Sequence, residues 1–209
     1  MKIAILIQAR YNSKRLPGKV CLKILNKELL LHVYNNCKRS CLKNIYVITS
    51  KNKSDKPIID LCTKNKIKYF KGNLTNVYLR YFQAIKKFKL DAFVRITGDS
   101  PLIDYNIINK AIKKFLKKKP DIITNVFPRT FPIGQSVEVI NSKIFINNYK
   151  NILKRNEKEH ITKYFYKNSK DFKIINFKNK RNESKKNLSI NTRKDFFKIK
   201  NIIKLNEKI

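Results

Sequence analysis

Residues 3–19 read IAILIQARYNSKRLPGK, and this stretch decides the fold. Its first part, residues 3–7, is a continuous apolar run that ends abruptly at the polar segment 8–19. A short run of this kind predicts a strand that is buried on both faces, which is typical of a parallel sheet. Because open parallel sheets bind ligands at the carboxyl ends of their strands, the polar segment is expected to be a binding loop.

Apolar runs and helical spacing alternate in the sequence that follows. Strands are expected at residues 45–49, 67–70, 91–96 and 121–125, and helices at residues 29–39, 58–65, 77–87 and 104–118. This alternation predicts the α/β class, as a doubly wound, mostly parallel sheet with helices on both faces.

The regular alternation of expected strands and helices ends after residue 126. Loops are expected at residues 127–136, which are rich in Pro and Gly, and at the charged residues 178–186. Short strands are expected at residues 137–140, 172–177 and 188–190, and helices at residues 142–153, 157–167 and 192–205. Thr192 is expected to cap the last helix, because Asp195 follows it by three residues. With neither a linker nor an internal repeat, residues 1–209 are expected to form a single domain.

The composition excludes several classes of protein. Of 209 residues, 49 are Lys or Arg and 14 are Asp or Glu, which gives a formal net charge of +35. Hydrophobic residues make up 42%, enough for a core rather than a disordered chain. No apolar run approaches the roughly 20 residues of a membrane span, and the run at residues 3–7 is too short for a signal peptide. Four cysteines without a C-x-x-C pair disfavour zinc and fit a reducing cytoplasm.

The positive charge is spread along the chain rather than gathered in one patch. Only nine of the 49 basic residues are Arg, whereas proteins that read bases or grip phosphates favour Arg for its planar fork. The abundance of Lys, Asn and Ile is typical of a codon bias toward A and T. A dedicated nucleic-acid-binding protein is therefore the less favoured alternative, although the charge attracts anionic ligands in general.

The loop at residues 8–19 carries the first chemistry. It places four basic side chains at the carboxyl end of the first strand, namely Arg10, Lys14, Arg15 and Lys19. Ser13 can form hydrogen bonds, and Gly18 allows backbone amides to approach a ligand closely. Such a loop suits a triphosphate, which has several charges to neutralise. It matches neither the Walker A pattern nor G-x-G-x-x-G, and a solvated basic loop is the alternative.

A second segment, RITGDSPLID at residues 95–104, begins in the last residues of the fourth expected strand and continues beyond it. A carboxylate on a tight turn at a strand end is well placed to hold Mg²⁺ beside a phosphate, and Asp99 is the candidate. Asp104 is expected to cap the following helix. Asp99 alone is weak evidence for a metal site. The prediction is supported because Asp99 is expected at the same edge of the sheet as the basic loop.

Together these two segments resemble the cytidylyltransferases that activate sugars with CTP. The patterns A-R-x-x-S-x-R-L-P-G-K and R-x-T-x-D-x-P-L-I-D are similar to those of the spore coat polysaccharide biosynthesis protein F group, which is related to the acylneuraminate and 3-deoxy-manno-octulosonate cytidylyltransferases. The resemblance continues in order through residues 70–81, 125–139, 159–162 and 188–196. It implies a Rossmann-like, nucleotide-diphospho-sugar transferase fold, Mg²⁺ as cofactor, and the transfer of CMP to a sugar with release of pyrophosphate.

The resemblance also implies roles for individual residues. The nucleotide would be bound by Gln8, Ala9, Arg10, Ser13, Arg15, Lys19, Arg80 and Asp99. The catalytic residues among them would be Arg15, Lys19 and Asp99. The acceptor sugar would be bound by Glu138, Glu159 and His160, and Mg²⁺ by Asp99 and Asn191. Residues 1–125 would thus form a nucleotide-binding half and residues 126–209 an acceptor-binding half, in which residues 137–167 are the candidate interface of a homodimer.

Four positions depart from the family pattern. Asn191 stands where the family has a second metal-binding Asp, Asn76 and Ser136 replace two further acids, and Lys14 replaces a Ser or Thr. An amide oxygen can bind Mg²⁺, but it lacks a full charge. The sequence is interpreted as a working CTP-dependent enzyme that acts on an acidic sugar for surface polysaccharide, in the cytoplasm. A catalytically impaired, nucleotide-binding relative is the alternative that Asn191 leaves open.

Overall fold

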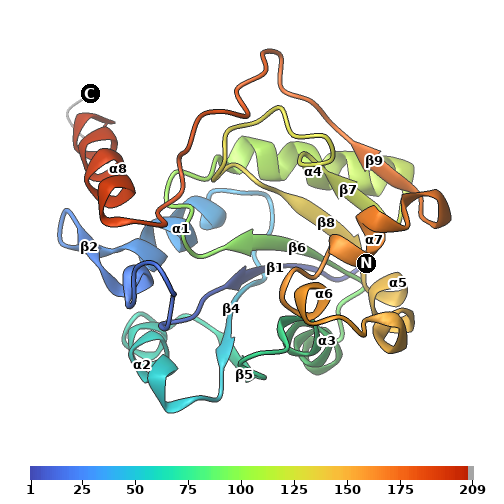
Figure 1. Cartoon of the computed structure of the whole chain (residues 1–209), viewed down its shortest axis with the longest axis horizontal. Helices are drawn as coiled ribbons and strands as arrows, with labels where there is room; N and C mark the ends of the chain where they lie inside the picture. Colours follow the sequence, from blue (N-terminus) through green and yellow to red (C-terminus); the bar gives the residue numbers. More distant parts are fainter. Residues whose placement is uncertain (207–209) are drawn as a thin grey trace.

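Seven strands form one sheet at the centre of the computed structural model, which describes residues 1–206 (Figure 1). In spatial order they are β5 (Tyr69–Gly72), β4 (Ile45–Ser50), β1 (Ile3–Gln8), β6 (Ala92–Thr97), β8 (Glu138–Asn141), β7 (Ile122–Thr124) and β9 (Ile174–Asn176). β8 runs antiparallel to both of its neighbours, and every other pair is parallel. The expected mostly parallel sheet of the α/β class is therefore confirmed.

β1 shows why the sheet is buried on both faces. The side chains of Ile3, Ile5 and Ile7 join one hydrophobic core, whereas those of Ala4 and Leu6 join a second core on the other face. All five residues are buried. Burial on both faces requires an apolar residue at every position, so the run is continuous rather than alternating.

Helices cover both faces of the sheet (Figure 1). The first core is covered by α1 (Leu29–Lys38), α2 (Lys56–Lys64), α4 (Tyr105–Lys118) and α8 (Arg193–Asn206). The second core is covered by α3 (Val77–Phe88), α5 (Ser142–Asn147) and α7 (Lys163–Lys167), and α6 (Arg155–Glu159) contacts α3. Within residues 1–206, none of the helices combines the length and the apolar character that crossing a bilayer requires.

A short hairpin that was not predicted from the sequence follows the loop after β1. It pairs β2 (Lys23–Ile24) with β3 (Lys27–Glu28). Leu25 and Asn26 turn it with φ angles of 50° and 60°, and a type I′ turn requires positive φ at both positions. Gly is the usual signal of such a turn, and this pair lacks it.

The single-turn 3₁₀ helices among the described residues are η1 (Lys19–Cys21), η2 (Lys53–Asp55), η3 (Tyr149–Asn151) and η4 (Ser169–Asp171).

With three exceptions, the expected strands and helices match the structure to within two residues. The first exception is the helix expected over residues 142–153, which ends at Asn147 and is followed by η3. The side chain of Asn148 donates a hydrogen bond to the carbonyl oxygen of Ile144 at 3.0 Å. A side-chain donor of this kind satisfies a carbonyl at the helix end, so the chain turns away there.

The other two exceptions lie further along the chain. The helix expected over residues 157–167 is split into α6 and α7, and the interruption lets Ile161 enter the second core, where it is fully buried. The strand expected over residues 188–190 is not part of any described strand. There the side chain of Asn187 accepts a hydrogen bond from the backbone N of Ser189 at 3.0 Å, and such local bonds compete with a strand ladder.

Both expected helix caps are confirmed. The Asp104 carboxylate accepts a hydrogen bond from the backbone N of Asn106 at 2.8 Å and caps α4. At α8, the Thr192 hydroxyl accepts from the N of Asp195 at 3.2 Å, and the Asp195 carboxylate accepts from the N of Thr192 at 2.9 Å. Burial raises the pKa of Asp195, but its hydrogen bonds outweigh burial and hold the pKa below its ordinary value.

Candidate functional site

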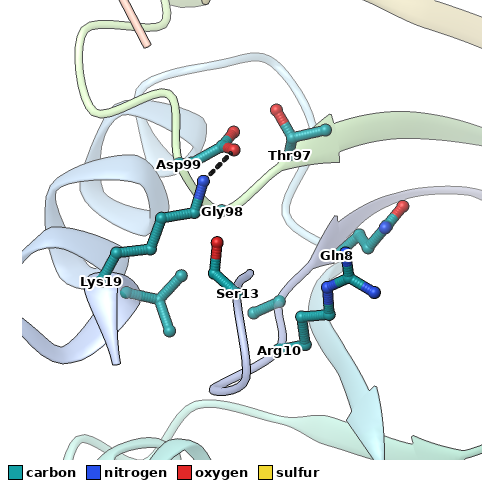
Figure 2. A pocket seen from close by; sticks show the side chains of 9 residues that line it. Gln8, Arg10, Ser13, Lys19, Thr97, Gly98 and Asp99 are labelled. Atoms are coloured by element: carbon teal, nitrogen blue, oxygen red, sulfur yellow. Dashed lines mark hydrogen bonds and ion pairs between the residues drawn. The ribbon is translucent and has the colours of Figure 1, made fainter. Parts of the chain in front are cut away.

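A cleft lies at the carboxyl ends of β1 and β6, where the two polar segments meet (Figure 2). Gln8 of β1 pairs with Thr97 of β6, so the residues that follow each strand start side by side. The cleft is lined by Gln8, Ala9, Arg10, Ser13, Lys19, Val20, Thr97, Gly98 and Asp99. Six of the eight residues that are predicted to bind the nucleotide therefore share one wall.

The loop after β1 is closed on itself by Tyr11. Its carbonyl oxygen accepts hydrogen bonds from the backbone N of Ser13 at 2.9 Å and of Gly18 at 2.8 Å. Gly18 has a φ of 70°, and a Cβ atom there would lie 3.0 Å from a ring carbon of Tyr11. The turn therefore favours glycine, both for its backbone conformation and for space.

Lys19 lies in the cleft and points toward Asp99 (Figure 2), and its ammonium group has three oxygen partners in all. Nζ donates hydrogen bonds to Asp99 Oδ2 at 2.7 Å, to the carbonyl oxygen of Ile190 at 2.8 Å and to Asn191 Oδ1 at 3.2 Å. Lys19 is only 7% exposed, so water has little access to this ion pair from the lysine side. One side chain therefore joins the loop after β1, the end of β6 and the segment before α8.

Asn191 is oriented by the start of α8. Its backbone N donates to Asp195 Oδ2 at 3.1 Å, and its side-chain Nδ2 donates to Ser189 Oγ at 2.9 Å. These bonds leave Oδ1 to face Lys19. The backbone N of Ile190 donates to the carbonyl oxygen of Asp99 at 2.9 Å and fastens the same segment to the end of β6. The two residues that are predicted to hold a metal are thus brought together.

The oxygens around Lys19 suit a hard cation. Asp99, Asn191 and the carbonyl group of Ile190 offer one carboxylate and two neutral oxygens, the type of donor that Mg²⁺ binds. Over residues 1–206, three or more His, Cys, Asp or Glu side chains do not gather anywhere as a metal site. The donors fit Mg²⁺ in kind, but a metal here would depend on a single protein carboxylate and would share its oxygens with the ammonium of Lys19.

An ion pair links the two halves of the chain beside the cleft. Arg10 Nη2 lies 3.2 Å from Glu159 Oε1, and the two side chains are 36% and 39% exposed. Glu159 ends α6, and the exposed residue His160 follows it. A predicted nucleotide-binding residue therefore contacts a predicted acceptor-binding residue. Because water weakens a pair this exposed, an anionic ligand can compete for Arg10.

Glu138, the third residue expected on the acceptor side, is turned into the protein. It is fully buried, and its two carboxylate oxygens accept hydrogen bonds from Arg95 and from the hydroxyl of Tyr166. Burial and the neighbouring carboxylate raise the pKa of Tyr166 well above its ordinary value. Glu138 is therefore committed to protein partners, and direct contact with an acceptor would require one of them to leave.

Arg15 and Arg80, both expected at the nucleotide, do not line the cleft. Arg15 is exposed on the loop after β1. Arg80 is fully buried and donates to the carbonyl oxygens of Asn73 and Leu74, both at 2.9 Å. Its Nη1 is buried without a partner in the described part of the chain, and burial lowers the pKa of the guanidinium. In this structure Arg80 fixes the turn that precedes α3.

Asp55 is a buried residue of the site that was not predicted from the sequence. Its Oδ1 accepts a hydrogen bond from the backbone N of Tyr11 at 2.8 Å, so it touches the loop after β1. In the sequence, Asp55 stands two residues before Pro57 and reads as an ordinary helix cap, although its side chain makes no capping bond to α2. Its role is visible only in space, because the loop lies far away in the sequence.

The chain resembles known proteins over almost its full length. The family described as Cytidylyltransferase matches residues 4–208. A solved cytidylyltransferase structure from Leptospira borgpetersenii matches with a TM-score of 0.95 and 33% identity, over 98% of this chain and 87% of that chain. The spore coat polysaccharide biosynthesis protein SpsF of Bacillus subtilis is 27% identical, over 78% of this chain and 69% of its own length. The 3-deoxy-manno-octulosonate cytidylyltransferase of Wigglesworthia glossinidia brevipalpis is 30% identical, over 69% of this chain and 58% of its own length.

Replacement of Lys19 by Met tests whether the ammonium holds the cleft together. The variant keeps an apolar side chain of similar length but loses three hydrogen bonds and leaves Asp99 without its ion-pair partner. We expect K19M to lower the free energy of unfolding by about 2 kcal/mol in urea denaturation.

The matched control is K14M, because Lys14 is exposed in the same loop. Its free energy of unfolding should change by less than about 0.5 kcal/mol. Equal losses in the two variants would show that the ammonium of Lys19 does not join the three segments.

Proposed function

This chain belongs to the cytidylyltransferase family, and on that premise we propose that it transfers CMP from CTP to a hydroxyl group of an acidic sugar. The hydroxyl oxygen forms a bond to the α-phosphorus, the bond from that phosphorus to the bridging oxygen breaks, and pyrophosphate leaves while the hydroxyl proton is lost. The observation that carries the proposal is the convergence of the basic loop, Asp99 and Asn191 on one cation position at the carboxyl edge of the sheet.

Charge neutralisation is the main contribution that we propose for the protein. Arg10, Ser13 and Lys19 would contact the triphosphate from the wall of the cleft, and Arg15 would reach it from the exposed part of the loop. Donors that are held in place before the reaction stabilise the charge on the leaving pyrophosphate without reorganising. Catalytic roles for Arg15 and Lys19 follow from this argument, whereas the proposed role of Asp99 depends on the metal that it would hold.

The nucleoside is proposed to lie against Gln8 and Ala9. The hydroxyl of Tyr81 donates to Gln8 Oε1 at 3.5 Å, so α3 helps to orient this residue. Arg80 is the neighbour of Tyr81 on α3, and its buried Nη1 lacks a partner over residues 1–206. Arg80 does not line the cleft, so its proposed contact with the nucleotide would require a movement of the turn at Asn73 and Leu74 that it binds.

Mg²⁺ is the proposed cofactor, and Asp99 and Asn191 Oδ1 would hold it. When bound, the ion would screen the phosphate charges and polarise the phosphoryl group under attack. Lys19 shares both oxygens in the structure. We therefore expect Lys19 to exchange its contact with Asp99 for phosphate oxygens when the nucleotide binds.

The acceptor is proposed to be a nonulosonic or octulosonic acid that serves surface polysaccharide. The name of the octulosonate cytidylyltransferase supports an octulosonic acid, and the name of SpsF supports a role in polysaccharide synthesis. The basic cleft favours an anion. Glu159 and His160 lie next to Arg10 and are the proposed acceptor contacts from the second half of the chain. A cytoplasmic homodimer, with residues 137–167 at its interface, stays part of the proposal.

The direct test of this function is the release of pyrophosphate. The protein is incubated with CTP, Mg²⁺ and a panel of nonulosonic and octulosonic acids, and ATP, GTP and UTP replace CTP in the controls. We expect release with CTP and at least one acid, at a rate about a hundredfold higher than with the other nucleotides. CTP binding in calorimetry without release for any acid would instead favour a nucleotide-binding relative that has lost catalysis.

The Asn191→Asp variant tests the metal site. A second carboxylate adds a full negative charge to the oxygens around Lys19, so we expect the Mg²⁺ concentration for half-maximal pyrophosphate release to fall about tenfold. Asn182→Asp is the control, because it adds the same charge at an exposed loop residue. An unchanged Mg²⁺ requirement in N191D would contradict a metal-binding role for residue 191.

The Glu159→Gln variant tests whether Glu159 competes with phosphate for Arg10. Loss of the ion pair frees the guanidinium, so we expect CTP to bind about two- to fivefold more tightly, as measured by calorimetry. Asp60→Asn is the matched control, because it removes the same charge from an exposed ion pair with Lys56 on α2. Weaker CTP binding in E159Q than in D60N would show that Glu159 supports nucleotide binding rather than opposing it.

A further inference from the structure

Asp55 is a buried carboxylate that is satisfied by hydrogen-bond donors alone. Its Oδ2 accepts from the hydroxyl of Thr49 at 2.8 Å and from both the hydroxyl and the backbone N of Ser50, at 2.6 and 2.9 Å. Its Oδ1 accepts from the backbone N of Tyr11 at 2.8 Å. Burial raises the pKa of Asp55, but these bonds outweigh burial and hold the pKa below its ordinary value. The carboxylate is therefore ionised, and over residues 1–206 it forms no salt bridge.

These donors come from two different parts of the fold. Thr49 and Ser50 are the last residues of β4, whereas Tyr11 is the residue that closes the loop after β1. The backbone N of Ala9 donates to the carbonyl oxygen of Ile48 at 3.1 Å and extends the contact of β1 with β4. Beyond Ala9, the Asp55 carboxylate connects the loop to β4, because it accepts hydrogen bonds both from the backbone N of Tyr11 and from Thr49 and Ser50.

Asp55 also supplies negative charge beneath a cationic site. The loop carries Arg10, Lys14, Arg15 and Lys19, and Arg80 is buried nearby. Burial lowers the pKa of Arg80, and the charge of Asp55 opposes that effect. Asp55 does not line the cleft, so its effect on a ligand there must pass through the loop.

We propose that Asp55 is a positioning residue for phosphate binding: its carboxylate fixes the N–H group of Tyr11 and so holds the loop in its binding shape before a ligand arrives. A loop that is already ordered loses little conformational freedom on binding, which raises affinity without a new contact. The identity of the ligand as CTP rests on the proposed function, whereas the ordering of the loop does not.

Asp55→Asn and Thr49→Val form a matched pair of variants. The neutral side chain of Asn offers one acceptor oxygen and one NH₂ group. If the NH₂ group faces Tyr11 the bond to the loop is lost, and if the oxygen faces Tyr11 the bond is weaker than a bond to a carboxylate, so D55N weakens this bond in either orientation. T49V removes one hydrogen bond to the same carboxylate but leaves the bond to Tyr11 in place. Both variants disturb one buried network, and only D55N disturbs the fastening of the loop.

Hydrogen exchange without ligand measures the loop directly. The backbone N–H groups of Ser13 and Gly18 both donate to the carbonyl oxygen of Tyr11 and report whether the loop stays closed. We expect these amides to exchange about tenfold faster in D55N than in the natural protein, and at an unchanged rate in T49V. Equal exchange rates in D55N and T49V would overturn the proposal, and this result does not depend on what the protein binds.

Steady-state kinetics supply the second measurement. We expect D55N to raise KM for CTP about tenfold with little change in kcat, and T49V to change neither. A merely structural role would lower the folded fraction, which reduces kcat and leaves KM in place, so that outcome would overturn the proposal. If the natural protein does not bind CTP, the proposed function fails, and inorganic tripolyphosphate is then the probe for the same tenfold difference in affinity.

A second variant covers the case in which D55N does not fold. An ester in place of the amide between residues 10 and 11 removes only the N–H group that Asp55 binds. The full chain can be made by joining a synthetic peptide of residues 1–20 to residues 21–209 at Cys21. Faster exchange at Ser13 and Gly18 in this chain would support the proposal, and unchanged exchange would overturn it.

Discussion

The cleft depends on one ammonium group with three oxygen partners. Lys19 reaches Asp99 at the end of β6 and both Ile190 and Asn191 before α8, so it unites three segments that share no helix or strand. A buried ammonium loses its water shell, and only several well-placed oxygens can offset that cost. The basic loop and the strand-end carboxylate would each be ordinary surface alone. Their contact turns the edge of the sheet into a site.

Burial on two faces explains which parts of the fold could be predicted from the sequence. β1 and β4 carry apolar side chains toward both cores, so their sequence pattern is clear. Residues 142–167 could not be predicted in the same detail, because their helices are short and end where single contacts form. The burial of Ile161 is one such contact, and the Gly-free hairpin turn at Leu25 is another feature without a local signal.

The features of the candidate site also fall into those that could be predicted from the sequence and those that could not. The approach of Asp99 to the basic loop followed from the rule that parallel strands end at one edge. The approach of Asn191 followed from the resemblance alone, because no local pattern links residues so far apart. Sequence does not distinguish a charged side chain that faces a ligand from one that faces a neighbour. For that reason Glu138 and Arg80 turned inward against expectation, and Asp55 was missed.

The first turn of α8 contributes both to the cap of the helix and to the wall of the cleft. Asp195 caps the helix, and the same carboxylate accepts the backbone N of Asn191 and so orients a wall of the cleft. During synthesis on the ribosome, the basic loop and Asp99 emerge long before residues 189–195. Until that segment appears, Lys19 lacks two of its three oxygen partners, Ile190 and Asn191. Because domains generally fold as units, the complete cleft can form only after this C-terminal segment has left the ribosome.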